Sequence, residues 1–522
     1  MRTIWRTADI RQVKAGSAQY SMLMRTSVGS LGVITAIVGL GCVLPAGAED
    51  SAARQITVDA TVTVGTLRPF SGVQAADAEG TAFYRAARVD LVRIHDVSPA
   101  ADIDAIFPDA GADVEDPKSY RFGPADRLVA SIKSGGAEPL FDLYGSAGAV
   151  AAVPDPDKWA QIVRHIVLHY NAGWNKGFRY GIRYWEVWNA PDSELSWRGT
   201  PQEYYALYEK AAQAIQSADD GALVGGPGLS KPLIAGAYRE KFFDFVRVHR
   251  LPLDFFSWHF RTVDSNDPYL FVSIARQLRT ILDSHGFGST HNLLDEWGAD
   301  PGDKDMSKTA RAAFATSALI YMLGGPIDAQ TYADGGADSV GRTLETFGSM
   351  KSTPQLVRTT GGDDAGFAVM AARSLDRRLI QVLIGNYQVA PKFLSHRDNW
   401  DTTLPERRLL QYHDNGGYDA SISVPTAGKY QVKRFRSDDS GNFTLVDQSM
   451  QNGPNLHLQA ALPPPAVELI VISEVKRQSK LVSFCQPDVA QHDRAARAAI
   501  EIEANTAQVG HIKMWIRGRK VL

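Results

Sequence analysis

The feature that most constrains the fold of this chain is a regular alternation of short apolar runs and amphipathic segments with helical spacing, from Ile56 to about Tyr332. Such an alternation is typical of parallel β-strands joined by crossover helices. Eight such units predict an α/β fold, a (β/α)₈ TIM barrel, over residues 49–345. The expected strands are Phe70–Val73, Val89–His95, Pro139–Tyr144, Ile182–Asn189, Ala222–Gly226, Asp254–His259, Asn292–Trp297 and Ile327–Tyr332.

Several of the intervening helices carry sequence signals for their first turn. Thr200–Glu203 combines an N-cap residue, a proline at the first helical position and a capping-box glutamate. Asp155-Pro156 and Asp267-Pro268 are expected to open two further helices. The alternative architecture is an open doubly wound sheet, whose first strand usually leads into a glycine-rich phosphate loop. No G-x-G-x-x-G sequence follows the first expected strand, so we favour the barrel.

Beyond about Gly348 the period of the pattern changes to short strands separated by Gly, Asp, Asn and Pro turns. This composition predicts a C-terminal β-sandwich domain over residues 346–474. Residues 475–522 resemble neither domain and are expected to form a solvated tail, with one helix near Arg494–Ala504. The expected strands of the sandwich are Phe367–Ala372, Leu379–Tyr387, Ala420–Val424, Tyr430–Phe435, Phe443–Val446 and Val467–Ile472.

The first 48 residues have the features of a signal peptide with an upstream extension. Arg25 precedes an apolar run, Val28–Pro45, which ends in the small-x-small sequence Ala46-Gly47-Ala48. We expect cleavage after Ala48 and export to the periplasm or the extracellular space, with no stable membrane insertion afterwards. Because the run is about long enough to cross a bilayer, an uncleaved anchor is the alternative.

The composition excludes several classes of partner and cofactor. Of the 522 residues, 44% are hydrophobic and 22% are charged, and the formal net charge is −3, which is typical of a soluble globular protein. The sequence shows no basic stripe, so we expect no nucleic-acid partner. After the signal segment Cys485 is the only cysteine, which rules out an intrachain disulfide there and a cysteine-based metal site. We expect neither a metal nor another cofactor.

In a (β/α)₈ barrel the chemistry sits where the strands end and the following loops begin. Glu296 is the sharpest candidate, because it ends an apolar strand and a carboxylate there is poorly solvated. A salt-bridged structural role is the alternative for a lone glutamate. We expect Arg93 to keep this carboxylate ionised. The residues at the strand ends, rich in hydrogen-bonding and aromatic groups, are Arg93, His95, Tyr144, Asn189, Ala190, Trp258, His259, Glu296, Trp297, Tyr332 and Asp334.

The segment Trp185–Asp192, which reads Trp-Glu-Val-Trp-Asn-Ala-Pro-Asp, resembles the strand-four motif of glycoside hydrolase family 39. This family contains β-xylosidases and α-L-iduronidases, and in its motif an Asn-Glu-Pro sequence supplies the catalytic acid/base. The resemblance extends from about Ile56 to Ile472, since the family also carries a C-terminal β-sandwich. Further segments similar to the family follow in chain order and are Val92–His95, Trp197–Thr200, Glu203–Tyr205, Val224–Pro227, Asp254–His259, Asp295–Gly298 and Arg434–Asp439.

The resemblance implies a retaining glycosidase, in which two carboxyl groups about 5–5.5 Å apart flank the scissile bond of an oligosaccharide or polysaccharide. It places the nucleophile at Glu296, and at Asn189 the residue that holds the 2-hydroxyl of the sugar. The acid/base position falls on Ala190, which has no ionisable group. The expected substrate-binding residues, implied by the resemblance or by their strand ends, are Asn189, His95, His259, Trp258, Tyr332, Trp297 and Arg93.

Alanine at the acid/base position leaves two function classes open. The first is a β-xylosidase-like glycosidase with impaired catalysis, and the second is a carbohydrate-binding pseudoenzyme of the same fold. Glu186 lies four residues earlier on the strand, about 13 Å toward the barrel floor, and is too far away to substitute. Asp192 and Glu194 lie in the following loop, from which a carboxylate could swing in. A barrel aldolase, as a third class, would need a lysine at a strand end, and none of the strand ends has one.

Overall fold

The computed structural model describes residues 53–75, 80–95, 101–145, 153–262, 266–335, 339–389, 416–438 and 441–475. The expected signal peptide, Cys485 and the helix near 494–504 lie outside these residues. In the described part of the chain, no helix has both the length and the apolar character needed to span a membrane.

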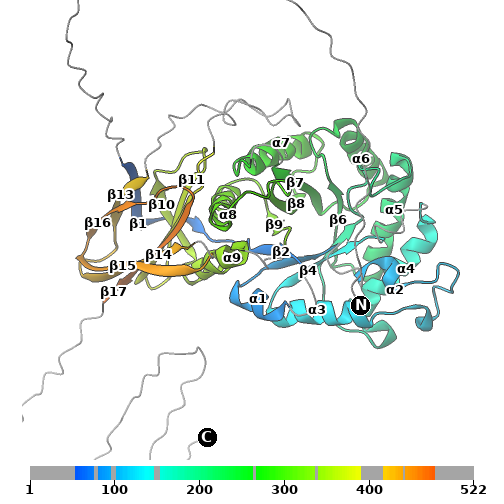
Figure 1. Cartoon of the computed structure of the whole chain (residues 1–522). Coiled ribbons are helices and arrows are strands. Elements are labelled where there is room, and N and C mark those ends of the chain that lie inside the picture. Colours follow the sequence, from blue (N-terminus) through cyan, green and yellow to red (C-terminus); the bar gives the residue numbers. More distant parts are fainter. Residues whose placement is uncertain are drawn as a thin grey trace, which may run out of the picture. The chain divides into compact units, whose positions relative to one another are not determined.

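Eight parallel strands close into a barrel, and each lies within or beside an expected run, so the predicted fold class is confirmed. The barrel closes where Val73 pairs with Tyr332. Figure 1 shows the strands at the centre of a ring of helices. In barrel order the strands are β2 (Gly72–Gln74), β3 (Leu91–Ile94), β4 (Glu138–Leu143), β5 (Tyr184–Val187), β6 (Leu223–Leu229), β7 (Phe255–Thr262), β8 (His291–Ala299) and β9 (Ala329–Tyr332).

The helices between the strands begin largely where the sequence signals place them. At the start of α5 the Thr200 hydroxyl accepts the Glu203 N–H while the Glu203 carboxylate accepts the Thr200 N–H, which completes the predicted capping box. Helix α7 begins after the expected Asp267-Pro268 start, because the Asp267 carboxylate accepts the N–H of Tyr269 in a preceding turn. The helices are α1 (Thr81–Ala86), α2 (Ile103–Ile106), α3 (Gly123–Gly135), α4 (Pro156–Asn171), α5 (Pro201–Ala218), α6 (Gly236–His249), α7 (Leu270–Ser284), α8 (Lys308–Leu323) and α9 (Ser339–Ser349), with 3₁₀ turns at Pro117–Ser119, Trp174–Lys176 and Met350–Ser352.

A second sheet of nine strands forms the C-terminal β-domain. All six strands expected in this domain are present, and β1, β10 and β16 were not predicted. The strands are β1 (Arg54–Thr66), β10 (Gln355–Thr360), β11 (Phe367–Arg373), β12 (Leu379–Asn386), β13 (Gly417–Ser423), β14 (Lys429–Ser437), β15 (Phe443–Asn452), β16 (Asn455–Ala461) and β17 (Ala466–Glu474).

Strand β1 changes the domain boundary that the sequence suggested. We expected residues 49–345 to form the barrel, but β1 pairs in antiparallel with β10 and in parallel with β13, inside the second sheet. Ile56, Val58 and Ala60 point from β1 into the core of that sheet. The N-terminal strand therefore belongs to the β-domain, and the barrel begins only with β2.

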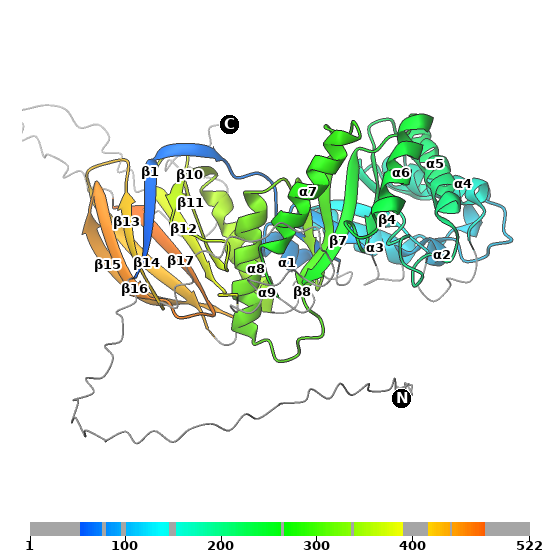
Figure 2. The same ribbon diagram turned by 90° about the horizontal axis from the view of Figure 1, so that it is seen from above.

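Alternating residues of the β-domain strands face two different cores. Ile380 and Val382 of β12 pack into the interior of the β-domain, whereas Leu383 belongs to the large cluster that contains the barrel helices. Figure 2 shows α8 and α9 beside this sheet. The Ser317 hydroxyl of α8 also donates a hydrogen bond to the Gly366 carbonyl. The face of the sheet that carries Leu383 thus packs on the barrel.

Candidate active site

Glu296 lies near the C-terminal end of β8, and its carboxylate is held by side chains from three other strands. The Gln74 amide donates to Oε2 over 3.0 Å. Arg261 donates from Nε and Nη2 to Oε1, both over 3.2 Å. Arg93 Nη1 lies 4.0 Å from Oε2, and the Glu296 side chain is 21% exposed. A carboxylate held from several sides, with part of its surface open, is placed to meet a ligand at the mouth of the barrel.

The charges around Glu296 determine its protonation. Burial alone raises the pKa of this carboxyl group, because it disfavours the charged form. The positive charges of His259, Arg261 and Arg93, together with the hydrogen bond from Gln74, outweigh burial and lower the pKa to about 2. At neutral pH Glu296 is therefore ionised, which is the form that a nucleophile needs.

Arg93 is the centre of the buried charge cluster beneath Glu296. Its Nε donates to Glu186 Oε2 over 2.7 Å, and its Nη2 lies 3.3 Å from both Asp142 Oδ2 and Asp295 Oδ2. Nη2 also donates to Asn189 Oδ1 over 2.9 Å. Burial lowers the pKa of the guanidinium, but the surrounding carboxylates outweigh burial, and the net effect is a raised pKa. Because Arg93 is fully buried, it holds other side chains in place and does not contact a ligand directly, which corrects the expectation that it binds substrate.

Glu186 and Asp295 are two buried carboxyl groups whose pKa values are shifted in opposite directions. Burial raises the pKa of Glu186 well above its ordinary value, and Asp295 and Asp142 add to this rise, while Arg93 opposes it. Asp295 is equally buried, but Arg93 and His259 lower its pKa to about 2. The pKa of Glu186 is therefore raised and that of Asp295 lowered although both groups are buried, and Glu186 does not reach the mouth of the barrel.

Two histidines at the strand ends are anchored by buried carboxylates. His95 Nδ1 lies 2.7 Å from Asp142 Oδ2, and His259 Nδ1 lies 3.6 Å from Asp295 Oδ1. Burial lowers the pKa of His259, but Asp295 and Glu296 more than offset this and raise it. Asp142 and Asp295 each lie 3.3 Å from Arg93 Nη2 as well, so a carboxylate links each ring to Arg93.

The turn after β5 positions Asn189 and Ala190. The Asn189 amide oxygen accepts from Arg93, so the orientation of this side chain is set from inside the barrel. Ala190 has a φ of +47° and is 5% exposed. Its N–H donates to the Gly228 carbonyl over 2.9 Å, and its own carbonyl accepts the Ser193 N–H over 2.9 Å. The backbone at Ala190 is thus fixed, and its side chain offers only a methyl group.

Gly228 at the end of β6 is required by the close approach of this turn. A Cβ atom there would lie 2.9 Å from Asp295 Oδ2 and 3.4 Å from Asn189 Oδ1, and the φ of +62° is also unfavourable for other residues. Strands β5, β6 and β8 therefore meet closely at this point.

Asp192 and Glu194, the two loop carboxylates considered as substitutes for the acid/base, differ in their surroundings. Asp192 accepts hydrogen bonds from the Ser230 N–H over 3.0 Å, the Ser230 hydroxyl over 3.2 Å and the Lys231 N–H over 2.9 Å. It therefore joins two loops and is not free to swing. Glu194 is exposed. A third carboxylate, Asp334, lies near the partners of Glu296, with its Oδ1 3.4 Å from Arg261 Nη1.

Two tryptophans expected to frame a sugar cleft are buried behind the strands. Trp258 and Trp297 are both fully buried. Trp258 donates its indole N–H to Asn292 Oδ1 over 2.7 Å, and Trp297 donates to the Gln330 side chain. Trp258 follows the alternation of β7 and points away from the interior side that holds His259. Trp297 packs against Phe271 of α7, with ring centroids 5.3 Å apart. Trp258 and Trp297 therefore support the strands, which corrects the expectation that they contact substrate.

Tyr332 and Tyr144 lie at the strand ends with little exposed surface. Tyr332 is 3% exposed and donates its hydroxyl to Asp334 Oδ2 over 3.1 Å. The Tyr144 ring meets the His95 ring edge to face, with centroids 5.2 Å apart. These contacts brace the residues of the mouth of the barrel.

Several site residues were missed in the sequence. Gln74 and Arg261 escaped because β2 and β7 extend further than the apolar runs that predicted them. Asp142, Glu186 and Asp295 each stand within an apolar strand, and a carboxylate in such a strand signals a buried charge network. This signal was present in the sequence for all of these carboxylates, but we inferred a functional role only for Glu296.

A (β/α)₈ barrel with an ionised glutamate at the end of its seventh strand and a hydrogen-bonded asparagine at the end of its fourth has the framework of a glycoside hydrolase. A family description, "Glycosyl hydrolases family 39", matches residues 48–277. Together with the relatives described below, this match shows that the chain belongs to glycoside hydrolase family 39.

Two β-xylosidases are similar to part of the chain. The enzyme of Caldicellulosiruptor saccharolyticus is 33% identical over 162 residues, which is 27% of this chain and 31% of that protein. The enzyme of Geobacillus stearothermophilus is 30% identical over 174 residues, covering 30% of this chain and 33% of the relative. The matched segment thus spans about a third of the length of either enzyme.

Solved structures resemble a much larger part of the chain. A glucosidase from Croceicoccus marinus has a TM-score of 0.72 and 31% identity, and it covers 81% of this chain and 100% of that one. A family 39 enzyme from Xanthomonas axonopodis pv. citri has a TM-score of 0.61 at 17% identity, covering 83% and 100% of the two chains. The second likeness concerns the fold alone.

Proposed function

We propose that this protein is a retaining glycosidase acting on O-glycosyl bonds, with β-xylosides as the first substrates to test, and that its catalysis is impaired at the acid/base step. The observation that carries the proposal is the state of Glu296. Its carboxylate lies at the C-terminal end of a barrel strand, partly exposed, and Gln74, Arg261 and Arg93 hold it ionised.

In the first step, a Glu296 oxygen attacks the anomeric carbon as the bond from that carbon to the leaving oxygen breaks. The leaving oxygen departs with the bonding electron pair, and the sugar remains as an ester on Glu296. Water then attacks the anomeric carbon, loses a proton to the solvent, releases the carboxylate and restores the original configuration. Asn189, oriented by Arg93, is placed to hold the sugar 2-hydroxyl, and His95 and His259 to line the first sugar subsite.

The acid that should protonate the leaving oxygen is missing in this proposal. Ala190 occupies the acid/base position, and Asp192 is tied to the loop after β6. General acid–base assistance is worth about 10²–10⁴-fold in rate. Natural glycosides, whose sugar leaving groups need protonation, should therefore turn over slowly, whereas activated aryl glycosides should lose much less. A carbohydrate-binding pseudoenzyme is the second candidate, since binding needs only hydrogen-bonding groups such as those retained at Asn189, His95 and His259.

Incubation with 4-nitrophenyl β-xyloside and β-glucoside, with and without azide, separates the two candidates. A glycosidase without its acid/base should release a burst of nitrophenol about equal to the enzyme concentration. Azide, which needs no base, should then accelerate turnover and give a glycosyl azide of retained configuration. Glu296→Gln is the matched control and should show no burst. A folded wild-type protein that gives no burst and no azide effect, yet binds oligosaccharides, would establish the pseudoenzyme.

A further inference from the structure

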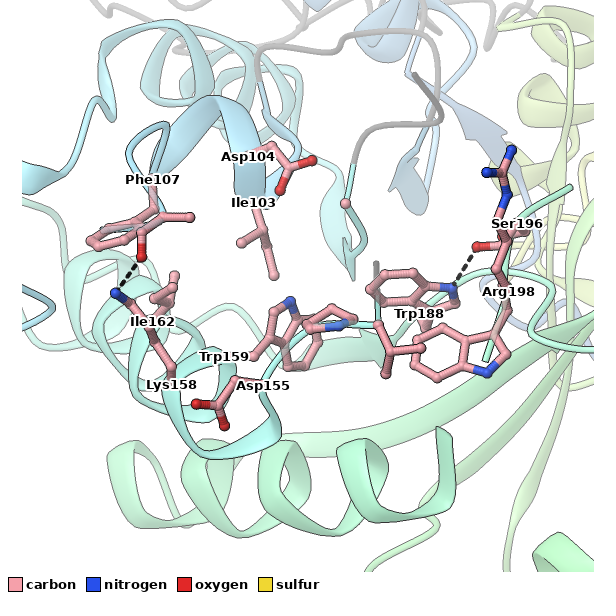
Figure 3. A pocket seen from close by; sticks show the side chains of 15 residues that line it. Ile103, Asp104, Phe107, Asp155, Lys158, Trp159, Ile162, Trp188, Ser196 and Arg198 are labelled. Carbon is pink, nitrogen blue, oxygen red and sulfur yellow. Dashed lines mark hydrogen bonds between the residues drawn. The ribbon is translucent and has the colours of Figure 1, made fainter. Parts of the chain in front are cut away.

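A cavity of about 310 Å³ lies beside the turn that carries Ala190. Its walls come from α2, the end of β4, the first turns of α4 and the loop after β5 (Figure 3). Pockets for small organic molecules begin at about this size. Within the described residues, the apolar lining includes Ile103, Phe107, Trp159, Ile162, Trp188 and Trp197.

The indoles present carbon surface to this cavity. The Trp188 N–H donates to the Ser196 carbonyl over 3.3 Å, and the Trp197 N–H donates to the Thr200 carbonyl over 3.0 Å. The two rings meet edge to face with centroids 5.0 Å apart, and the ring centroids of Trp159 and Trp188 are 6.0 Å apart. Since the N–H groups of Trp188 and Trp197 are satisfied by the backbone, the wall suits an apolar, preferably aromatic, guest.

The one lysine of the lining is also engaged. The Lys158 ammonium donates to the Ala110 carbonyl over 2.5 Å and to the Ala112 carbonyl over 3.0 Å. It lies 5.6 Å from the centroid of the Phe107 ring. The lysine therefore serves mainly to tie the loop after α2. The other charged residues of the lining are Asp104, Asp155 and Arg198, so the charges of the wall are of both signs and the tryptophans supply its apolar part.

The position of the cavity relative to the reaction follows from the strands that supply its walls. Among the residues that the structure describes, the lining comes from the segments that follow β3, β4 and β5, and none of it comes from β6 to β9. Trp188 in the wall stands two positions before Ala190. In a retaining mechanism the acid/base acts on the leaving oxygen, opposite the nucleophile. The cavity thus lies on the same side of the barrel as the turn that carries Ala190, whereas Glu296 lies on β8, three strands further round.

We propose that this cavity binds the aromatic aglycone of an aryl glycoside, so that the substrates of this protein are glycosides of phenols. The inference rests on the proposed glycosidase function and deepens it. A phenol such as tyrosine has a pKa near 10, so a phenolate departs with the electron pair of the broken bond and without a proton from the enzyme. The phenolate takes a proton from water afterwards. An aryl leaving group is therefore the class of substrate for which alanine at residue 190 costs least.

Binding of unhydrolysable thioglycosides tests this proposal apart from turnover. The probes are phenyl and methyl 1-thio-β-D-xyloside, and the corresponding glucosides, measured by calorimetry on the full protein. Burying a phenyl ring should make the phenyl compound bind at least about 10-fold more tightly than the methyl compound of the same sugar.

The matched variants are Gly145→Leu and Gly123→Leu. Gly145 lines the cavity, and a Cβ there would have ordinary contacts, 3.5 Å from Asp104 Oδ2 and 3.6 Å from Trp188 Cη2, so the longer side chain must fill the space. Gly123 lies at the start of α3, where a Cβ would meet nothing within 4 Å. Gly145→Leu should reduce the preference for phenyl to less than about 2-fold, and Gly123→Leu should preserve it. If Gly145→Leu has a much lower melting temperature than the wild type, Gly145→Ala replaces it and should show an intermediate loss of the preference for phenyl.

Three results would overturn the assignment. The wild type could bind the phenyl and methyl compounds equally, or the phenyl preference could survive Gly145→Leu in a folded protein. Xylobiose could also displace the phenyl compound and bind more tightly, which would make the cavity a second sugar subsite. If neither thioglycoside binds at all, the failure lies with the proposed glycosidase function itself, and the aglycone assignment falls with it.

Discussion

Replacing Ala190 by glutamate should restore the acid/base and raise the turnover of glycosides with poor leaving groups. The backbone at this residue has a φ of +47° and is held by hydrogen bonds to Gly228 and Ser193. We expect these hydrogen bonds to keep the same φ when the side chain is changed. Since alanine already has a Cβ, glutamate adds no new class of backbone strain. The added carboxyl group would start from a fixed Cβ beside Asn189, at the end of β5.

The expected gain follows from the chemistry of the step. General acid assistance of about 10²–10⁴-fold corresponds to about 2.7–5.4 kcal/mol of the barrier. The gain should be at least about 100-fold for xylobiose, whose leaving oxygen needs a proton. It should be less than about 10-fold for a dinitrophenyl xyloside, whose leaving group needs little protonation.

Kinetics of Ala190→Glu on both substrates provide the assay, and Ala190→Gln is the control of the same size without an ionisable group. A new basic limb in the pH profile should appear only with glutamate, because the acid must be protonated. A folded Ala190→Glu protein that remains inert on xylobiose would refute the placement of the acid/base at this residue. An equal gain with glutamine would show that side-chain size is responsible.

Three further outcomes are expected. Removing one of the cations that lower the pKa of Glu296, with Arg261→Met, should move the acid limb of aryl-glycoside hydrolysis to higher pH by about one unit, and an unchanged limb would contradict the assigned cause. Asp192→Ala should lower the free energy of unfolding by about 1–3 kcal/mol with aryl-glycoside rates unchanged, whereas a selective loss of rate would give Asp192 a role in the chemistry. The pKa values of Asp295 and Glu296 fall from 3.8 and 4.5 to about 2 on folding, so their stabilisation is present above about pH 4.5 and lost as pH falls toward 2. Near pH 2–4 Glu186 is protonated in both the folded and the unfolded protein, because its pKa is raised on folding. The melting temperature should therefore decrease as the pH is lowered through this window.

The barrel could be predicted from the sequence because each of its strands is a compact apolar run followed by a helix with its own start signals. The capping box at Thr200–Glu203 and the runs that contain Phe141 or Trp185 act locally, and local signals are readable in one sequence.

The domain boundary could not be predicted in the same way. Strand β1 has the alternation of a strand, with Ile56, Val58 and Ala60 buried, but its partners β10 and β13 lie far along the chain. Pairing over such separations depends on the tertiary arrangement of the whole β-domain. The sequence shows that a strand forms, and only the structure shows which sheet it joins.

The candidate site was predictable where a residue stands at the end of an apolar run, as Glu296, His95 and Asn189 do. It was not predictable where a strand continues through polar residues, as β7 does to reach Arg261. The aromatic side chain of Trp258 suggested a surface on which a sugar ring could stack. Because side chains alternate along a strand, Trp258 instead points into the layer between the strands and the helices. Composition at a strand end identifies candidates, and side-chain direction decides among them.

Covalent labelling by 2,4-dinitrophenyl 2-deoxy-2-fluoro-β-xyloside, and by the glucoside, tests directly whether Glu296 is the nucleophile. The dinitrophenolate departs without a proton, and the fluorine slows hydrolysis of the glycosyl ester. Mass spectrometry of the peptides should find one sugar on Glu296 in the wild type and none in Glu296→Gln. A folded wild-type protein that stays unlabelled with both reagents, or that is labelled at another residue, would contradict this assignment.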